Sequence, residues 1–74
     1  MKLNLLSLGQ SAILKSISNP LFSTKLAELG LIEGTRFSLI LKAPFNGPIA
    51  IHFGNTTLSI RSEEANYLLV DKVK

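Results

Sequence analysis

The sequence has no cysteine and no tryptophan, a single histidine, and few charged residues, which make up 18% of the chain. Without cysteine, disulfide bonds, thiolate metal sites and thiol catalysis are all excluded. Long hydrophobic runs are lacking as well, because the longest, residues 67–70, is far below the roughly 20 residues that a membrane-spanning helix needs. We therefore expect a protein that does not span a membrane and whose stability comes from packing or from a partner.

Hydrophobic residues are abundant by contrast, at 46% of 74 residues. A chain of this length typically buries only about 60% of the surface that its unfolded form exposes, so some apolar side chains must stay at the surface. We predict one small folded domain over residues 1–74. Residues 1–8 are interpreted as part of a mature, cytoplasmic protein, because no small-x-small cleavage site of a secretion signal follows them.

The net charge is +3, and the basic residues are spread singly along the chain, never adjacent. A nucleic-acid-binding protein usually shows a basic arm or stripe, and none is visible in this sequence. The charge alone is therefore a weak argument for a nucleic-acid partner.

One helix is predicted over residues 20–29, because both of its ends are marked. Asn19 is a favoured N-cap residue, and Pro20 suits the first helical position. Gly30 suits the left-handed position after the helix, which places Leu31 against Leu26 as in a Schellman motif. The expected docking stripe has apolar residues four and three positions apart, namely Phe22, Leu26 and Leu29.

Alternating apolar and polar residues predict five short strands, at residues 10–17, 35–42, 49–53, 57–61 and 68–70. The second strand has the clearest pattern, with Phe37, Leu39 and Leu41 expected on its core face. Ile40 breaks the alternation by placing a large apolar group on the opposite face. Residues 54–55 read Gly-Asn and predict a tight hairpin turn between the third and fourth strands.

A short helical turn is expected after the fourth strand, with Ser62 as its cap and Glu63 and Glu64 in its first turn. Five short strands cannot bury both faces of an open sheet, and unpaired edges invite aggregation. We therefore predict a mainly β fold, a small SH3-like barrel of about five short strands. The one helix, inserted after the first strand, is expected to pack over one end of the barrel.

Three motifs in chain order resemble those of the FeoA family, small cytosolic proteins of bacterial ferrous-iron uptake. Residues 25–34 read KLAELGLIEG and are similar to the family's K-L-x-x-L-G-L-x-x-G segment. Residues 43–49 read APFNGPI and resemble its A-P-L-G-D-P-I loop. Residues 58–65 are similar to its final strand and E-x-A turn. An ordered set of three motifs is specific, where one alone would mean little.

The resemblance covers residues 5–70, and it departs from the family pattern at one place in the loop. Phe45, Asn46 and Gly47 stand where the pattern has Leu-Gly-Asp, so an acidic residue is missing. Any role of that acid in partner contact or ion binding is therefore not carried over to this chain.

The resemblance implies an accessory to a FeoB-type membrane transporter of ferrous iron, which carries a cytoplasmic GTP-binding domain. The same domain type also occurs at the C-terminus of metal-dependent repressors. No winged-helix or metal-sensing region precedes it in this sequence, so the repressor interpretation loses its DNA-binding half. We accordingly expect a regulatory, non-enzymatic interaction module without a cofactor or a small-molecule substrate.

Candidate catalytic and metal sites are sparse. The five carboxylates are scattered and form no triad-like or G-x-S-x-G pattern, which predicts that the protein is not an enzyme. His52 is the only imidazole, and its nearest candidate co-ligands are Glu63 and Glu64. One histidine and a carboxylate do not complete a tight metal site, so we predict no metal ligands. His52 is interpreted as an exposed residue on the outer face of a strand.

A stand-alone SH3-like module that binds nucleic acid or a transcriptional regulator is the alternative function. Single-strand binding of this kind uses aromatic side chains stacked on a strand face among basic residues. Phe37 and Phe53 share the apolar phase of their strands and are expected in the core, which leaves Phe45 and Tyr67. Nucleic acid is therefore the less favoured partner.

The most informative feature is a surplus of apolar residues outside the expected core, namely Leu21, Ile40, Pro44 and Phe45. They either cover one another as a satellite cluster or form a patch on the helix and the loop of residues 43–48. In the second case the patch docks on another protein or on a second copy of this chain, and these four are the candidate partner-contact residues. A groove for proline-rich peptides is less favoured, since it needs a row of exposed aromatics.

Overall fold

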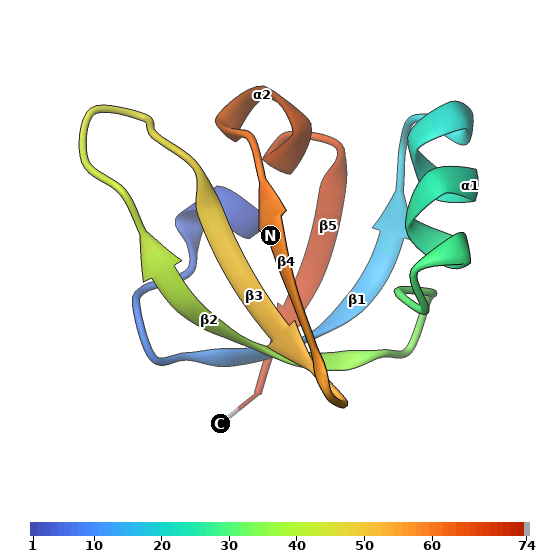
Figure 1. Cartoon of the computed structure of the whole chain (residues 1–74), viewed down its shortest axis with the longest axis horizontal. Helices are drawn as coiled ribbons and strands as arrows, with labels where there is room; N and C mark the ends of the chain where they lie inside the picture. The colour runs from blue at the N-terminus through green and yellow to red at the C-terminus, as the bar shows by residue number, and fades with distance from the viewer. Residues whose placement is uncertain (74) are drawn as a thin grey trace.

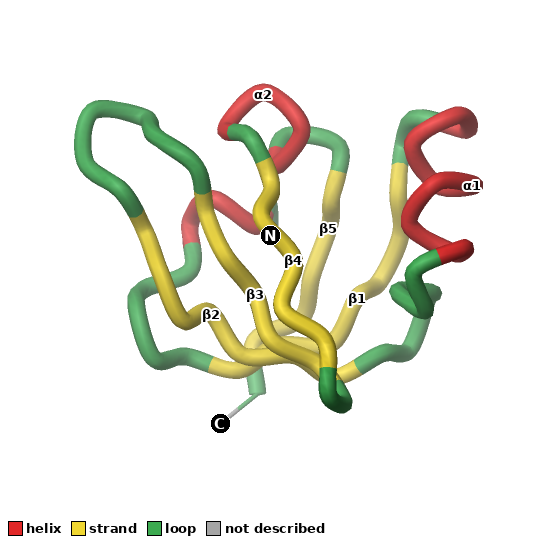
Figure 2. The backbone as a smooth tube through the Cα atoms, viewed as in Figure 1, coloured by secondary structure: helices red, strands yellow, loops and turns green. Residues whose placement is uncertain are grey.

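Five antiparallel strands form one sheet in the computed structural model, which describes residues 1–73 (Figure 1). The strands are β1 (Ser11–Ile17), β2 (Arg36–Lys42), β3 (Ile49–Phe53), β4 (Thr56–Ile60) and β5 (Leu68–Lys72). Their order in the sheet is β4-β3-β2-β1-β5. Figure 2 shows that the strands curl around a common centre, which is the SH3-like barrel expected from the sequence.

Three helical segments complete the fold: η1 (Leu3–Leu5), α1 (Pro20–Glu28) and α2 (Ser62–Ala65). The helix α1 follows β1, as predicted, but it lies along the side of the barrel next to β1 and not over one end (Figure 1). The single turn α2 sits at the top of the view, between β4 and β5. The predicted element order is therefore confirmed, with η1 as an addition that the sequence pattern did not indicate.

The start of α1 has the predicted cap. The side-chain oxygen of Asn19 accepts a hydrogen bond of 3.1 Å from the backbone N–H of Phe22. This bond satisfies one of the backbone donors that the first turn of a helix leaves without an intrahelical partner. Pro20 occupies the first helical position, where a missing N–H costs nothing.

The end of α1 is the predicted Schellman motif. Gly30 has a φ of 97°, its N–H donates to the carbonyl of Ala27, and the N–H of Leu31 donates to the carbonyl of Leu26. Both Leu31 and Leu26 are buried, so the apolar contact that accompanies this motif is formed in the core. The prediction for Leu29 was wrong: as the C-cap residue it turns outward and is 46% exposed.

A β-bulge in β2 overturns the prediction that Leu41 faces the core. Leu39 pairs with Ile51, but the next pair joins Leu41 to Ala50, so Ile40 is an extra residue in β2. A bulge of this kind shifts the side-chain alternation by one position. Leu39 is fully buried as expected, whereas Leu41 is 52% exposed.

The cap of α2 also differs from the prediction. Ser62 is the first residue of the helical turn, and the N-cap is Arg61. The side-chain oxygen of Glu64 accepts a 3.0 Å hydrogen bond from the backbone N–H of Arg61, and the carbonyl of Arg61 accepts one from Ala65. The acidic residue closes the turn by this reciprocal bond, so a serine hydroxyl is not needed.

The segment before β1 belongs to the core. Leu3 and Leu6 are completely buried in the same cluster as the strand residues. Two carbonyl groups of this segment, those of Asn4 and Leu6, each accept a 2.9 Å hydrogen bond from Nζ of Lys42. Lys42, at the end of β2, thus attaches this segment to the sheet by two hydrogen bonds.

Leu26 provides a test of the core. It is 2% exposed, so Leu26→Ala should lower the free energy of unfolding by about 2–5 kcal/mol through lost contacts and a residual cavity. The matched control is Leu21→Ala on the same helix, which should change stability by less than about 0.5 kcal/mol because Leu21 is 85% exposed. Urea titration followed by circular dichroism measures both variants, and equal losses would contradict this account of the core.

Candidate functional site

The loop between β2 and β3 ends in a tight turn of unusual composition. The N–H of Gly47 donates a 3.1 Å hydrogen bond to the carbonyl of Pro44. The two residues between them, Phe45 and Asn46, have φ values of 58° and 59°. Two successive positive φ values inside such a bond define a type I′ turn, which normally contains asparagine and glycine.

Gly47 is required by the packing of this loop and not by its backbone angles. A Cβ atom at Gly47 would lie 2.7 Å from Cβ of Ala43 and 3.1 Å from the carbonyl oxygen of Pro44. Ala43 in turn donates a 3.0 Å backbone hydrogen bond to Pro48, which closes the base of the loop. The loop is therefore closed at its base by Ala43 and Pro48 and at its tip by Pro44 and Gly47.

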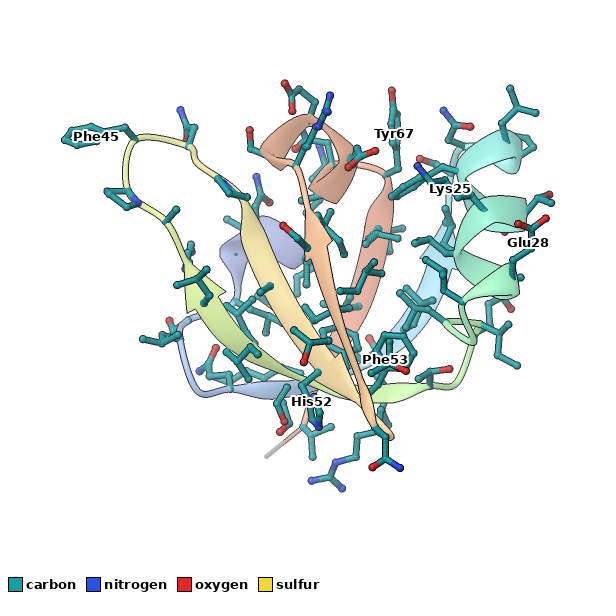
Figure 3. All side chains as sticks on the ribbon, in the orientation of Figure 1. Lys25, Glu28, Phe45, His52, Phe53 and Tyr67 are labelled. Atoms are coloured by element: carbon teal, nitrogen blue, oxygen red, sulfur yellow. The ribbon has the colours of Figure 1, made fainter. Side chains whose placement is uncertain are left out.

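Phe45 occupies that tip, and its side chain is 100% exposed. Figure 3 shows its ring pointing away from the barrel. A left-handed conformation costs a bulky L-residue roughly 1–2 kcal/mol, and the apolar ring gains nothing from the fold in return. A strained, fully exposed aromatic residue is the kind of outlier that points to a contact outside the chain.

The other predicted contact residues are also exposed, but they do not all lie together. Pro44 adjoins Phe45 in the turn, and Ile40 lies in the bulged part of β2 that leads into the loop. Leu21 lies in α1, which is on the opposite side of the barrel from the loop (Figure 1). The structure thus brings Pro44 and Phe45 together and leaves Leu21 apart, so helix and loop do not form one surface.

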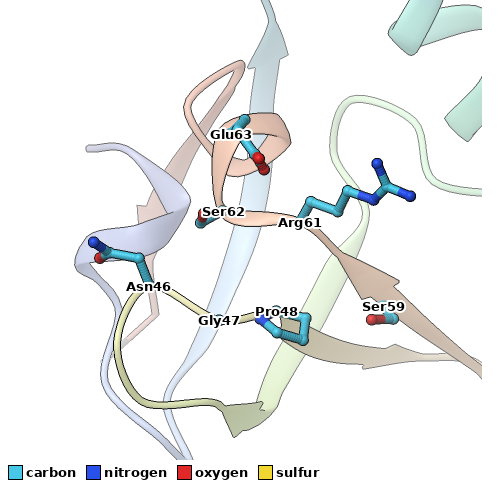
Figure 4. Close-up of a pocket in the computed structure, with 7 residues that line it drawn as sticks. All are labelled: Asn46, Gly47, Pro48, Ser59, Arg61, Ser62 and Glu63. Carbon is cyan, nitrogen blue, oxygen red and sulfur yellow. The ribbon is translucent and has the colours of Figure 1, made fainter.

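Two open cavities flank the loop. The larger, of about 560 Å³, lies between the loop and the junction of β4 with α2 (Figure 4). Its lining includes Pro48, Ser59, Arg61 and Glu63. The sequence pattern did not reveal it, because its two walls are separated along the chain and meet only through the pairing of β3 with β4.

The smaller cavity, of about 310 Å³, lies on the other side of the loop and is lined in part by Phe45, Lys42 and Asn4. The side-chain oxygen of Asn4 is buried and has no hydrogen-bond partner among the described residues. Neither cavity is lined by a histidine, and the larger one is lined by one carboxylate, Glu63.

His52 is exposed on the outer face of β3, where it was expected. Its Nδ1 lies 3.1 Å from the hydroxyl oxygen of Thr57 on the neighbouring strand. Figure 3 places His52 near the bottom of the barrel, whereas Glu63 belongs to α2, which lies at the top in Figure 1. Within residues 1–73 no three His, Asp or Glu side chains come close enough to hold a metal ion.

The aromatic residues of the strands are buried and Phe45 in the loop is exposed, as the alternating strand pattern predicts. Phe37 and Phe53 are buried in the core. Tyr67 packs against Phe22 of α1 with 6.1 Å between the ring centroids, which leaves Phe45 alone at its loop tip. Figure 3 shows Phe45 and Tyr67 on different parts of the molecule, so they do not form a stacking row.

The FeoA domain model matches residues 1–72. The chain belongs to the FeoA family. Chlorobium tepidum FeoA superposes on this FeoA chain with a TM-score of 0.91 and 29% identity, over 100% of this chain and 71% of the other. Stenotrophomonas maltophilia FeoA, whose structure contains zinc, gives a TM-score of 0.79 and 30% identity, over 96% and 89%. That protein is described as a prokaryotic SH3 domain protein and is suggested as an activating factor of bacterial ferrous iron transport.

The family is thus linked to ferrous iron transport, as the three sequence motifs indicated. No curated protein shows a significant match to the chain. A manganese-dependent transcriptional repressor contains a similar unit, with a TM-score of 0.87, 20% identity and coverage of 41% of the repressor. At that identity the likeness shows a shared fold and nothing about DNA. Among residues 1–73, no helix has the length and apolar character to cross a bilayer.

The backbone at Phe45 yields a second prediction. Phe45→Asn should raise the free energy of unfolding by about 0.5–1 kcal/mol, because asparagine tolerates the left-handed conformation that phenylalanine resists. Urea titration measures the change, with Phe45→Ala as a control that removes the ring without favouring positive φ. A clear loss of stability in Phe45→Asn would mean that the ring supports the fold.

Proposed function

We propose that this FeoA protein is a non-enzymatic accessory protein of ferrous-iron transport, acting in the cytoplasm on a FeoB-type membrane transporter. The observation that carries the proposal is Phe45, which is fully exposed in a left-handed conformation at the tip of a defined loop. The loop binds the cytoplasmic part of the transporter through Phe45 and the adjacent Pro44, and the exposed part of β2 at Ile40 extends the contact.

The energetics favour an anchoring role for Phe45. Transfer of an exposed phenylalanine side chain into an apolar pocket gains about 1.5–3 kcal/mol. The loop is already closed by the Gly47 and Ala43 hydrogen bonds, so little order has to be gained when it binds. Large aromatic residues that enter a pocket on the partner are the usual hot spots of protein interfaces.

The charge of the protein supports the same type of partner. With a net charge of +3 the chain is attracted to an acidic surface, which raises the rate of association more than the affinity. The exposed ring then supplies the short-range apolar contact. The expected partner surface is an apolar pocket with an acidic rim.

The mechanism of such a protein is a shift in the conformations of its partner. Binding changes the balance between two transporter states only by the difference between the affinities of the FeoA protein for those states. No covalent step is involved, and the two loop cavities are not needed for chemistry. The suggestion that the Stenotrophomonas relative is an activating factor agrees with this class of mechanism.

A charge at the loop tip tests the proposal. Phe45→Asp should weaken co-purification with the detergent-solubilised transporter by about ten- to a hundredfold, because the ring is lost and a charge enters an apolar pocket. Ferrous-iron uptake in cells that depend on the variant should fall in parallel. Aspartate suits a type I′ turn, so the fold is retained, and the thermal transition of the purified variant verifies this.

The matched control is Leu21→Asp. It adds the same charge at another highly exposed apolar residue, but on α1, away from the loop. Uptake and co-purification should stay near the level of the unchanged protein. If Leu21→Asp abolishes binding and Phe45→Asp does not, the interface lies on α1 and the loop assignment is wrong.

A further inference from the structure

The strand β4 is an end strand of the sheet, and no strand among the described residues pairs with its outer edge. In the sheet β4 pairs only with β3, in a register that joins Phe53 to Thr56 and His52 to Thr57 across a two-residue turn. In such a hairpin the pair that flanks the turn is hydrogen-bonded, and bonded and non-bonded pairs alternate from there. The backbone groups of Thr57 and Ser59 therefore point away from β3.

The pairing on the other side of β3 gives the same result. The backbone N–H of Ala43 donates to the carbonyl of Pro48. Hydrogen-bonded and non-bonded pairs alternate along β2 and β3, so the backbone groups of Ala50, two residues after Pro48, also bond to β2. Ala50 is the partner of Ser59 in the β3–β4 register, so Ser59 has no backbone bond to β3. Among the described residues, no hydrogen bond from elsewhere in the chain reaches the backbone of Thr57 or Ser59.

The two edge strands, β4 and β5, differ in whether their outer backbone groups are paired. The outer edge of β5 is partly covered, because Lys2 bridges to Leu69 and the N–H of Val70 donates to the carbonyl of Met1. Within residues 1–73 no backbone hydrogen bond or bridge covers the outer edge of β4 in this way. Proteins usually protect an open edge with a charged residue, a proline or a bulge, and β4 reads Thr-Thr-Leu-Ser-Ile with a regular register.

We propose that two copies of this chain pair through their β4 edges, antiparallel and about a two-fold axis, with Thr57 of each copy opposite Ser59 of the other. This register uses all four outward groups of each strand, N–H and C=O of both residues, in four intermolecular hydrogen bonds. No outward-pointing backbone group of Thr57 or Ser59 is left unpaired, and the two sheets become continuous.

The side chains in this register are compatible on both faces. On the outer face Thr57 lies beside Ser59 of the second copy, a favourable hydroxyl pair for neighbouring strands. On the inner face the half-buried Leu58 of one copy lies opposite Leu58 of the other. Arg61 falls opposite Asn55, so no like charges meet although each chain carries a net charge of +3. A second copy therefore meets this edge with a hydroxyl pair, an apolar pair and no charge clash.

The dimer is expected to be weak and reversible. A contact made by one strand edge buries less than the roughly 1,200 Å² of a stable interface. The proposal is independent of the Phe45 contact with a transporter, because Phe45 lies in the loop between β2 and β3 and not on this edge. Phe45→Asp should therefore leave self-association unchanged, so failure of one proposal does not imply failure of the other.

A concentration series by nuclear magnetic resonance tests the dimer. Between about 20 µM and 2 mM, a range that spans weak dissociation constants, translational diffusion should slow and the amide signals of β4 should shift. The amides of Thr57 and Ser59 should exchange with solvent rapidly in dilute solution and become protected at high concentration. No concentration dependence up to 2 mM, or shifts confined to the loop around Phe45, would overturn the proposal.

Ser59→Pro is the decisive variant. It removes an outward N–H and no bond to β3, so the fold should tolerate it, while two of the four intermolecular bonds are lost and the dimer weakens by about tenfold or more. Ser59→Thr is the matched control, since it keeps the N–H and should dimerise normally. Thr57→Pro tests the same point if Ser59→Pro does not fold. Dimerisation of a folded proline variant at the original strength would show that the edge is not the interface.

Discussion

The fold depends on burial of a single apolar surface, the concave side of the curled sheet. The chain has no cysteine, and the buried residues among those described are all hydrophobic, so aliphatic and aromatic packing is the main source of stability. A curled sheet of five short strands does not enclose its core by itself, and the helical segments contribute further buried side chains. Leu3 and Leu6 enter the core from the segment that contains η1, and Leu26 enters it from α1. The buried leucines of each segment thus also hold that segment against the sheet.

The bulge in β2 links this closure to the candidate site. It turns Leu41 outward and ends the core alternation at Leu39. At the end of the same strand, Lys42 holds the carbonyls of Asn4 and Leu6. The loop with Phe45 at its tip begins directly after this anchored residue. Its position is therefore fixed at the base by the contact between β2 and the segment before β1.

Local signals in the sequence predicted the fold well. The cap at Asn19 and the Schellman motif at Gly30 involve residues a few positions apart, so they could be recognised from spacing alone. The break in alternation at Ile40 was visible along the chain, but it did not reveal the outward turn of Leu41, because the bulge depends on pairing with β3. The burial of Leu3 likewise depends on contacts between distant segments. For the site, exposure of Phe45 was predictable from its place in a loop. The left-handed backbone of that residue, and the separation of the loop from α1, required three-dimensional information.

The close contact of Gly47 with Ala43 also bears on how such a protein changes over evolutionary time. The base of the loop accepts few substitutions, whereas the side chain at position 45 is fully exposed. Mutations at the tip are therefore nearly uncoupled from mutations in the core. A substitution at position 45 therefore changes the surface that the loop presents to solvent without any repacking of the barrel.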